Sequence, residues 1–210
     1  LAWHLIHLSR EHLETIDHLR SLKMHNLEDY INIYPALDKE FCEKIRSELD
    51  SVSWKQHVFY NANGEYVTQS GNRELDVSWD EIPSRAKLTQ KVWETVGKYI
   101  LEDFKNPYFT GWSGFTPMRF NRYHPDRLMA LHCDHIHDMF DGQRKGIPTL
   151  TILGLLNDDY EGGEFLMFDE EKEIKFKAGD IMIFPSVFLY PHKVAPVTKG
   201  VRDAFVSWVW

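Results

Sequence analysis

Residues 179–210 decide the fold and read GDIMIFPSVFLYPHKVAPVTKGVRDAFVSWVW. Three runs within this stretch, Ile181–Phe184, His192–Val197 and Val201–Val209, are rich in the β-branched and aromatic residues that strands favour. Turn residues separate the runs, and the clearest break is Lys199-Gly200. The pattern therefore predicts three strands at the carboxyl end of the chain.

The same pattern extends upstream to about residue 107, where the spacing of apolar residues changes from a helical to a strand period. Further strands are predicted at Pro117–Tyr123, Leu128–Cys133, Thr149–Leu156, Glu164–Phe168 and Glu173–Lys177. Many short strands with evenly spaced turns are typical of a sandwich or a small barrel. The second half of the chain is therefore predicted to be a β-barrel.

The first hundred residues read mainly as helices. One apolar stripe contains Leu1, Leu5, Leu8, Ile16 and Leu19. A second helix is predicted after the cap residue Asp38, and a third after Pro83-Ser84. Short strands are expected at Tyr30–Tyr34 and in a hairpin that joins Val58–Tyr60 to Tyr66–Val67. We predict one domain over residues 1–210, with helical support and outer strands in 1–106 and the β core in 107–210.

Composition and charge exclude several classes of protein. Hydrophobic residues make up 43% and charged residues 27%, as in ordinary globular chains. The net charge of −8 argues against a nucleic-acid partner, because neutralisation of phosphates by cations dominates such binding. No apolar run is long enough to span a membrane. With only two cysteines, Cys42 and Cys133, we expect a reducing, cytoplasmic location.

His132-Cys133-Asp134 and the downstream His192 form the candidate metal site. Side chains two apart on a strand share a face, so His132 and Asp134 point the same way. Two imidazoles and one carboxylate make a facial triad that suits iron(II) and leaves coordination positions open. The ordinary alternative is a solvent-facing polar pair. A second His-x-Asp match, His124-Pro125-Asp126, is interpreted as a turn because its proline interrupts two strand-like runs.

Arg202 follows His192 on a strand that is otherwise apolar. Such an arginine is either exposed at the edge of the sheet or buried so that it binds an anion. A guanidinium can bind a carboxylate because two of its N–H donors match the two carboxylate oxygens. Tyr123 precedes His132 and could donate a hydrogen bond to the same anion, although plain core packing is common for a strand tyrosine.

Five stretches follow one another along the chain: Asn121-Arg122-Tyr123, His132-Cys133-Asp134, Glu161-Gly162-Gly163-Glu164-Phe165, Gly179 through Ser186, and His192 through Arg202. In this order, they resemble the motifs of the iron(II)- and 2-oxoglutarate-dependent oxygenases, in particular their prolyl-4-hydroxylase-like branch. The resemblance covers roughly residues 117–210, and Tyr30–Leu49 looks like the strand and helix that begin the family's domain. It implies a mainly β fold, the double-stranded β-helix or jelly roll, with amino-terminal helices packed on one face.

The same resemblance implies roles for single residues. His132, Asp134 and His192 would bind Fe(II). Arg202 would pair with the 5-carboxylate of 2-oxoglutarate and Tyr123 would donate to this cosubstrate. Thr151, where relatives place a small hydroxyl residue, and Asn121, on the strand face of Tyr123, would lie beside it.

The activity implied is hydroxylation of an unactivated C–H bond, first of all in a prolyl residue of a peptide or protein. 2-Oxoglutarate and O₂ would be converted to succinate and CO₂, with ascorbate as an optional reductant. Retention of Asp134 favours hydroxylation, because related halogenases carry a small apolar residue there. Other small-molecule substrates stay open, and the sequence does not specify an oligomeric state.

Two alternatives remain from the sequence. The DNA-dealkylating branch of the same superfamily shares an Asn-x-Tyr strand before its His-x-Asp, but the negative charge opposes it. A cupin-like barrel that binds metal without catalysis leaves Arg202 and Tyr123 unexplained. The polar stretch from His135 to Pro148 is either a substrate lid or a solvated connector.

Overall fold

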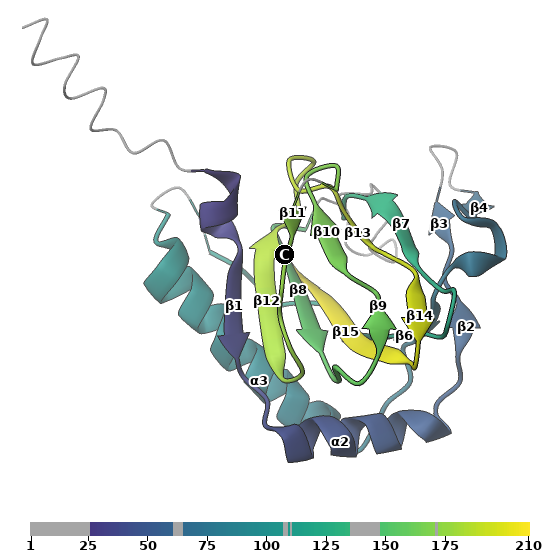
Figure 1. Cartoon of the computed structure of the whole chain (residues 1–210). Helices are drawn as coiled ribbons and strands as arrows, with labels where there is room; N and C mark the ends of the chain where they lie inside the picture. Colours follow the sequence, from purple (N-terminus) through teal and green to yellow (C-terminus); the bar gives the residue numbers. More distant parts are fainter. Residues whose placement is uncertain (1–25, 61–64, 107–108, 110, 135–147, 171) are drawn as a thin grey trace, which may run out of the picture.

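The computed structural model describes residues 26–60, 65–106, 109, 111–134, 148–170 and 172–210. The predicted first helix, around Leu1 to Leu19, lies outside the described residues. The described part contains two α-helices, α2 (Lys39–Glu48) and α3 (Arg85–Lys98), and is otherwise mainly β (Figure 1). Short helical turns lie at Leu27–Tyr30, Leu49–Ser51, Gly71–Arg73 and Tyr99–Phe104.

Both predicted helix starts are confirmed. The carboxylate of Asp38 accepts a hydrogen bond from the backbone N–H of Phe41 at 2.7 Å and so caps α2. α3 begins directly after Ser84. Each helix buries one apolar stripe, because residues three and four apart share a face. These stripes are Phe41, Cys42 and Ile45 on α2, and Leu88, Val92, Thr95 and Val96 on α3.

The larger sheet has seven antiparallel strands among the described residues, in the order β1-β12-β8-β15-β6-β5-β2. Its long central strands come from the second half of the chain, whereas β1, β2 and β5 are contributed by the first half. The bounds are β1 Asn32–Pro35, β12 Asp180–Pro185, β8 Leu150–Leu155, β15 Arg202–Val209, β6 Arg119–Tyr123, β5 Asp76–Ser78 and β2 Lys55–Gln56.

A smaller antiparallel sheet lies in front of the larger one (Figure 1). Its order is β11-β10-β13-β7, with bounds Lys172–Glu173, Phe165–Met167, His192–Val194 and Met129–His132. Two short strand pairs complete the described structure. They are β9 (Glu161–Gly162) with β14 (Val197–Lys199), and the predicted hairpin of β3 (Phe59–Tyr60) with β4 (Tyr66–Val67).

Strand β15 shows how the larger sheet separates two apolar layers. Phe205 and Val209 pack with the helices on one face, whereas Ala204, Val206 and Trp208 pack with the smaller sheet on the other. Strict alternation along a strand produces this division. The layer between the sheets contains the polar site, and the layer under the helices supports its back wall. The predicted helical support on one face is therefore present.

Some predicted strand bounds differ from the structure. The predicted strand His192–Val197 divides into β13 and β14, and its break includes Pro196, which has no backbone N–H to donate to a ladder. The predicted strand Glu173–Lys177 is present only as Lys172–Glu173. Within the described ranges, no helix combines the length and apolarity that crossing a membrane requires.

Candidate metal and cosubstrate site

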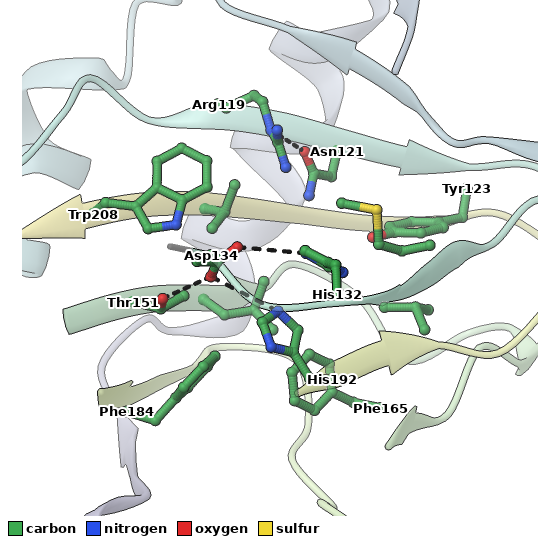
Figure 2. A pocket seen from close by; sticks show the side chains of 14 residues that line it. Arg119, Asn121, Tyr123, His132, Asp134, Thr151, Phe165, Phe184, His192 and Trp208 are labelled. Atoms are coloured by element: carbon green, nitrogen blue, oxygen red, sulfur yellow. Dashed lines mark hydrogen bonds and ion pairs between the residues drawn. The ribbon is translucent and has the colours of Figure 1, made fainter. Parts of the chain in front are cut away.

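Three of the predicted residues converge between the two sheets. His132 ends β7, Asp134 follows it, and His192 begins β13 directly opposite His132. One ligand atom from each residue lies within 4.8 Å of the other two. Asp134 is central to the group: its Oδ1 lies 3.4 Å from Nε2 of His132 and its Oδ2 lies 3.7 Å from Nε2 of His192 (Figure 2).

Backbone carbonyls orient both imidazoles. Nδ1 of His132 is 2.8 Å from the carbonyl oxygen of Ala130, and Nδ1 of His192 is 3.0 Å from that of Tyr190. A carbonyl accepts only, so Nδ1 carries the proton in each ring and Nε2 keeps its lone pair. The two lone pairs are therefore available on the side where Asp134 lies.

The electrostatics of the group favour metal binding. Burial opposes ionisation of Asp134, but His192, His132 and the Thr151 hydroxyl together hold the pKa of this carboxyl below its usual range. Burial, with His132 next to it, lowers the pKa of His192 to about 4. At neutral pH, Asp134 is thus an anion and His192 a neutral ligand. One carboxylate and two imidazoles fit a divalent iron ion with open coordination positions.

Thr151 supports the triad from β8. Its hydroxyl donates to Oδ2 of Asp134 at 2.7 Å and lies 2.8 Å from the hydroxyl of Ser186. Both hydroxyl residues are buried. Thr151 lines the pocket, and its hydrogen bond holds the carboxylate of Asp134. Ser186 lies in a predicted motif, and the sequence alone did not reveal its contact with Thr151.

Arg202 and Tyr123 are paired on neighbouring strands β15 and β6. Arg202 is 1% exposed, so it is not an edge residue, and its Nε and Nη1 atoms make no hydrogen bond to any residue the structure describes. A buried guanidinium without an acceptor is costly, which points to an anionic ligand. Burial raises the pKa of Tyr123, so its phenol stays protonated and can donate to that ligand. This donor set fits a carboxylate.

Asp203, the residue after Arg202, does not neutralise it. Alternation directs the Asp203 carboxylate to the opposite side of β15, where it binds Arg122 at 2.7 Å and Arg46 at 3.2 Å. The backbone N–H of Asp203 donates to Asn157 at 2.7 Å. These contacts hold the beginning of β15 in place while the Arg202 side chain faces the core between the sheets.

The pocket in front of the triad is lined by both sheets (Figure 2). Arg119 and Trp208 line it although neither was predicted as a site residue. The two-residue period of a strand could have identified them. Arg119 is two residues before Asn121 and Trp208 is six residues after Arg202, so each lies on the same strand face as a predicted site residue. The other lining residues are Asn121, Tyr123, Met129, His132, Asp134, Thr151, Leu153, Phe165, Phe184, His192, Val194 and Val206.

His57 is buried close to the site. Its ring lies 4.7 Å from that of Phe59, which in turn lies 5.7 Å from the ring of His132. Burial, together with Arg119, lowers the pKa of His57 to about 2. His57 is thus a neutral residue behind the site. The candidate lid, His135 to Pro148, lies outside the described residues apart from Pro148.

Comparison with known protein families finds a match over the carboxyl-terminal part of the chain. Residues 118–210 match the family model of the 2OG-Fe(II) oxygenase superfamily. A PKHD-type hydroxylase of Herminiimonas arsenicoxydans is 30% identical over 177 residues, which cover 79% of this chain and 72% of the relative. A PKHD-type hydroxylase of Shewanella sp. (strain MR-7) is 27% identical, covering 85% of this chain and 77% of that protein.

A solved structure has a similar fold, although its sequence is distant. A prolyl hydroxylase from Trichoplax adhaerens, in complex with a hypoxia inducible factor peptide fragment, superposes with a TM-score of 0.63 and 17% identity. The alignment covers 97% of this chain and 94% of that one. With the family match and the relatives named as hydroxylases, the chain belongs to the 2OG-Fe(II) oxygenase superfamily and is an enzyme of its prolyl-4-hydroxylase-like branch.

Proposed function

We propose that His132, Asp134 and His192 hold one Fe(II) ion and that the chain hydroxylates an unactivated C–H bond. The convergence of their three ligand atoms within 4.8 Å carries this proposal. The iron, when bound with 2-oxoglutarate and O₂, supplies the oxidising chemistry that couples formation of succinate and CO₂ to hydroxylation. Three protein ligands leave the remaining positions to cosubstrate and oxygen.

The residues around the metal have separate tasks in this proposal. Arg202 binds the 5-carboxylate of 2-oxoglutarate and Tyr123 donates to it, which would satisfy the buried guanidinium donors. Asn121 lies two residues along β6 from Tyr123 and would lie beside the cosubstrate, toward its end away from Arg202. Thr151 holds Asp134 in its ligating orientation. The buried rings of Phe165 and Phe184 exclude water.

For the substrate we propose a prolyl residue of a peptide or protein. The likeness to a hydroxylase solved with a peptide supports this class. We further assign the two facing sheets to a jelly roll, the double-stranded β-helix, with residues 107–210 as the core of a single domain. Ascorbate is proposed as an optional reductant, and the cytoplasm as the location.

The proposal is tested by incubating the chain with Fe(II), 2-oxoglutarate, ascorbate and a library of proline-containing peptides in air. We expect succinate and a peptide product heavier by one oxygen atom, and both are lost in Asp134→Ala. His124→Ala, in the other His-x-Asp sequence, is the matched control because its side chain is exposed, and it keeps full turnover. Formaldehyde from methylated DNA would instead indicate dealkylation, and metal binding without consumption of 2-oxoglutarate a cupin-like role.

A further inference from the structure

Arg119 faces the triad from the opposite wall of the pocket. Figure 2 shows it with Asn121 on β6, on the other side of Asp134 from His192. Its Nε donates to Oδ1 of Asn121 at 3.0 Å, and its guanidinium carbon lies 5.1 Å from the ring centre of Trp208. These two contacts fix the plane of the guanidinium. Its two terminal amino groups make no hydrogen bond within the described structure. They are therefore available to bind a carboxylate in a bidentate manner.

Trp208 supplies an independent donor at the same place. It is 4% exposed, and its buried Nε1 makes no hydrogen bond to the residues that the structure describes. Figure 2 shows the indole nitrogen on the ring edge nearest Asp134. A buried N–H without an acceptor costs about 1–3 kcal/mol. Arg119 and Trp208 therefore both present unused donors to the space in front of the triad. Asp134, the one carboxylate among the described residues that line the pocket, already accepts a hydrogen bond from Thr151.

The spacing along β6 separates this donor pair from the Arg202 end of the site. Tyr123, Asn121 and Arg119 occupy successive inward positions, and two residues of strand span about 6.8 Å. Arg202 is opposite Tyr123, whereas Val206 is opposite Arg119. The two carboxylate carbons of 2-oxoglutarate are four C–C bonds apart, or about 5 Å when extended. With one carboxylate at Arg202, the other reaches the level of Asn121. The donors of Arg119 and Trp208 lie beyond it.

We propose that Arg119 and Trp208 form a subsite for a carboxylate of the molecule that is oxidised. Resting on the proposed function, this narrows the substrate class to amino acids and peptides whose target residue has a free α-carboxylate, such as a carboxyl-terminal prolyl residue. Arg119 binds the carboxylate with its terminal amino groups and Trp208 donates one further hydrogen bond. Asn121 acts as a positioning residue, because it holds the guanidinium through Nε.

The test measures binding directly, by calorimetry on the anaerobic protein loaded with Fe(II) and 2-oxoglutarate. The probes are two matched pairs: L-proline with L-prolinamide, and Ala-Ala-Pro with its carboxyl-terminal amide. We expect at least one acid to bind about 10-fold more tightly than its amide, as one or two charge-assisted hydrogen bonds would give. Arg119→Gln and Trp208→Phe, which keeps an aromatic ring but lacks the N–H, should each remove most of this preference. Arg73→Gln, exposed and paired with Asp126, is the matched control.

The affinity for 2-oxoglutarate shows whether the carboxylate that Arg119 and Trp208 bind belongs to the substrate or to the cosubstrate. We expect it to change less than about 2-fold in Arg119→Gln and Trp208→Phe, with unchanged thermal unfolding. A loss as large as that of Arg202→Gln would assign these donors to the cosubstrate and overturn the proposal. Equal binding of acid and amide in both pairs, or binding of neither, would overturn it as well. Failure of the proposed function is detected separately, in measurements made without any of the four probes. A protein that then neither binds iron nor consumes 2-oxoglutarate would contradict the proposed function itself.

Discussion

Arg202 lies directly across the strand pair from Tyr123, with its guanidinium carbon 5.0 Å from the centre of the tyrosine ring. A second aromatic ring, that of Tyr160, lies 5.9 Å from the same carbon. The rings can stabilise the cation but leave its hydrogen-bond donors unused. The charge is therefore held in a dry environment where a carboxylate is the natural partner.

Arg202→Gln should raise the KM for 2-oxoglutarate by about 30-fold or more, since a charge-assisted bidentate contact is worth about 2–3 kcal/mol. Tyr123→Phe should have a smaller effect in the same direction because it removes one neutral donor. Steady-state kinetics with varied 2-oxoglutarate check both variants, with Arg73→Gln as the control. An unchanged KM in Arg202→Gln would mean that the cosubstrate anion is bound elsewhere.

Thr151→Val should weaken Fe(II) binding by about 10-fold, because loss of the hydrogen bond to Asp134 frees the carboxylate to turn and raises its pKa. Thr95→Val is a matched control: this buried threonine of α3 donates to the Lys91 carbonyl, far along the chain from the site. Calorimetric titration of the metal-free protein measures both dissociation constants. Equal iron affinity in Thr151→Val and the wild type would contradict the supporting role.

The metal-free protein should lose stability on acidification. His57 and His192 have folded pKa values of about 2 and about 4, whereas an unfolded histidine titrates near 6.5. Below that value the unfolded chain binds more protons than the folded chain, so the free energy of unfolding falls with pH. Each imidazole accounts for about 2 kcal/mol between about pH 7 and pH 5.

Urea unfolding at several pH values measures this slope, and His57→Gln should remove about half of it. The slope is the decisive quantity, since the substitution also changes packing at every pH. A His57→Gln protein with the wild-type slope would contradict this, because it would show that His57 has the same pKa in the folded and the unfolded chain.

Gly154→Ala should destabilise the protein by about 2 kcal/mol or more, because a Cβ at this position of β8 would overlap the ring of Phe205 on β15. Gly97→Ala is the opposite case. A Cβ added at Gly97 on helix α3 would meet no atom within 4 Å apart from its chain neighbours and the backbone of its own helix, so alanine should stabilise the helix by about 1 kcal/mol. Thermal or urea unfolding measures both changes, and a neutral Gly154→Ala would contradict the close packing of β8 on β15.

The strands that carry the site were predictable because each has a clear local pattern. Along Arg202 to Val209, alternate residues belong to the two apolar layers on opposite faces of the sheet. His132 and Asp134 are two residues apart, which is the spacing of side chains on one face of a strand. By contrast, β2 and β5 have only two and three residues, too few for a period to show. They are formed by long-range pairing: β5 pairs with β6, and β2 pairs with β5 at the edge of the sheet.

The unpredicted site residues depend on register between strands. Val206 pairs with Arg119, and Trp208 pairs with Thr151, so the two donors meet only after three distant segments have aligned. No single segment encodes that alignment. The family motifs predicted the triad and Arg202, whereas the position of Arg119 opposite the triad required the structure.

The most direct measurement of the central claim is an anaerobic titration of the protein with Fe(II) and then 2-oxoglutarate, followed by calorimetry and by the visible absorption of the ferrous 2-oxoglutarate chelate. We expect one Fe(II) per chain and a chelate band that His192→Ala and Asp134→Ala abolish and His124→Ala retains. Full iron binding and an unchanged band in His192→Ala and Asp134→Ala would contradict a metal centre built from His132, Asp134 and His192.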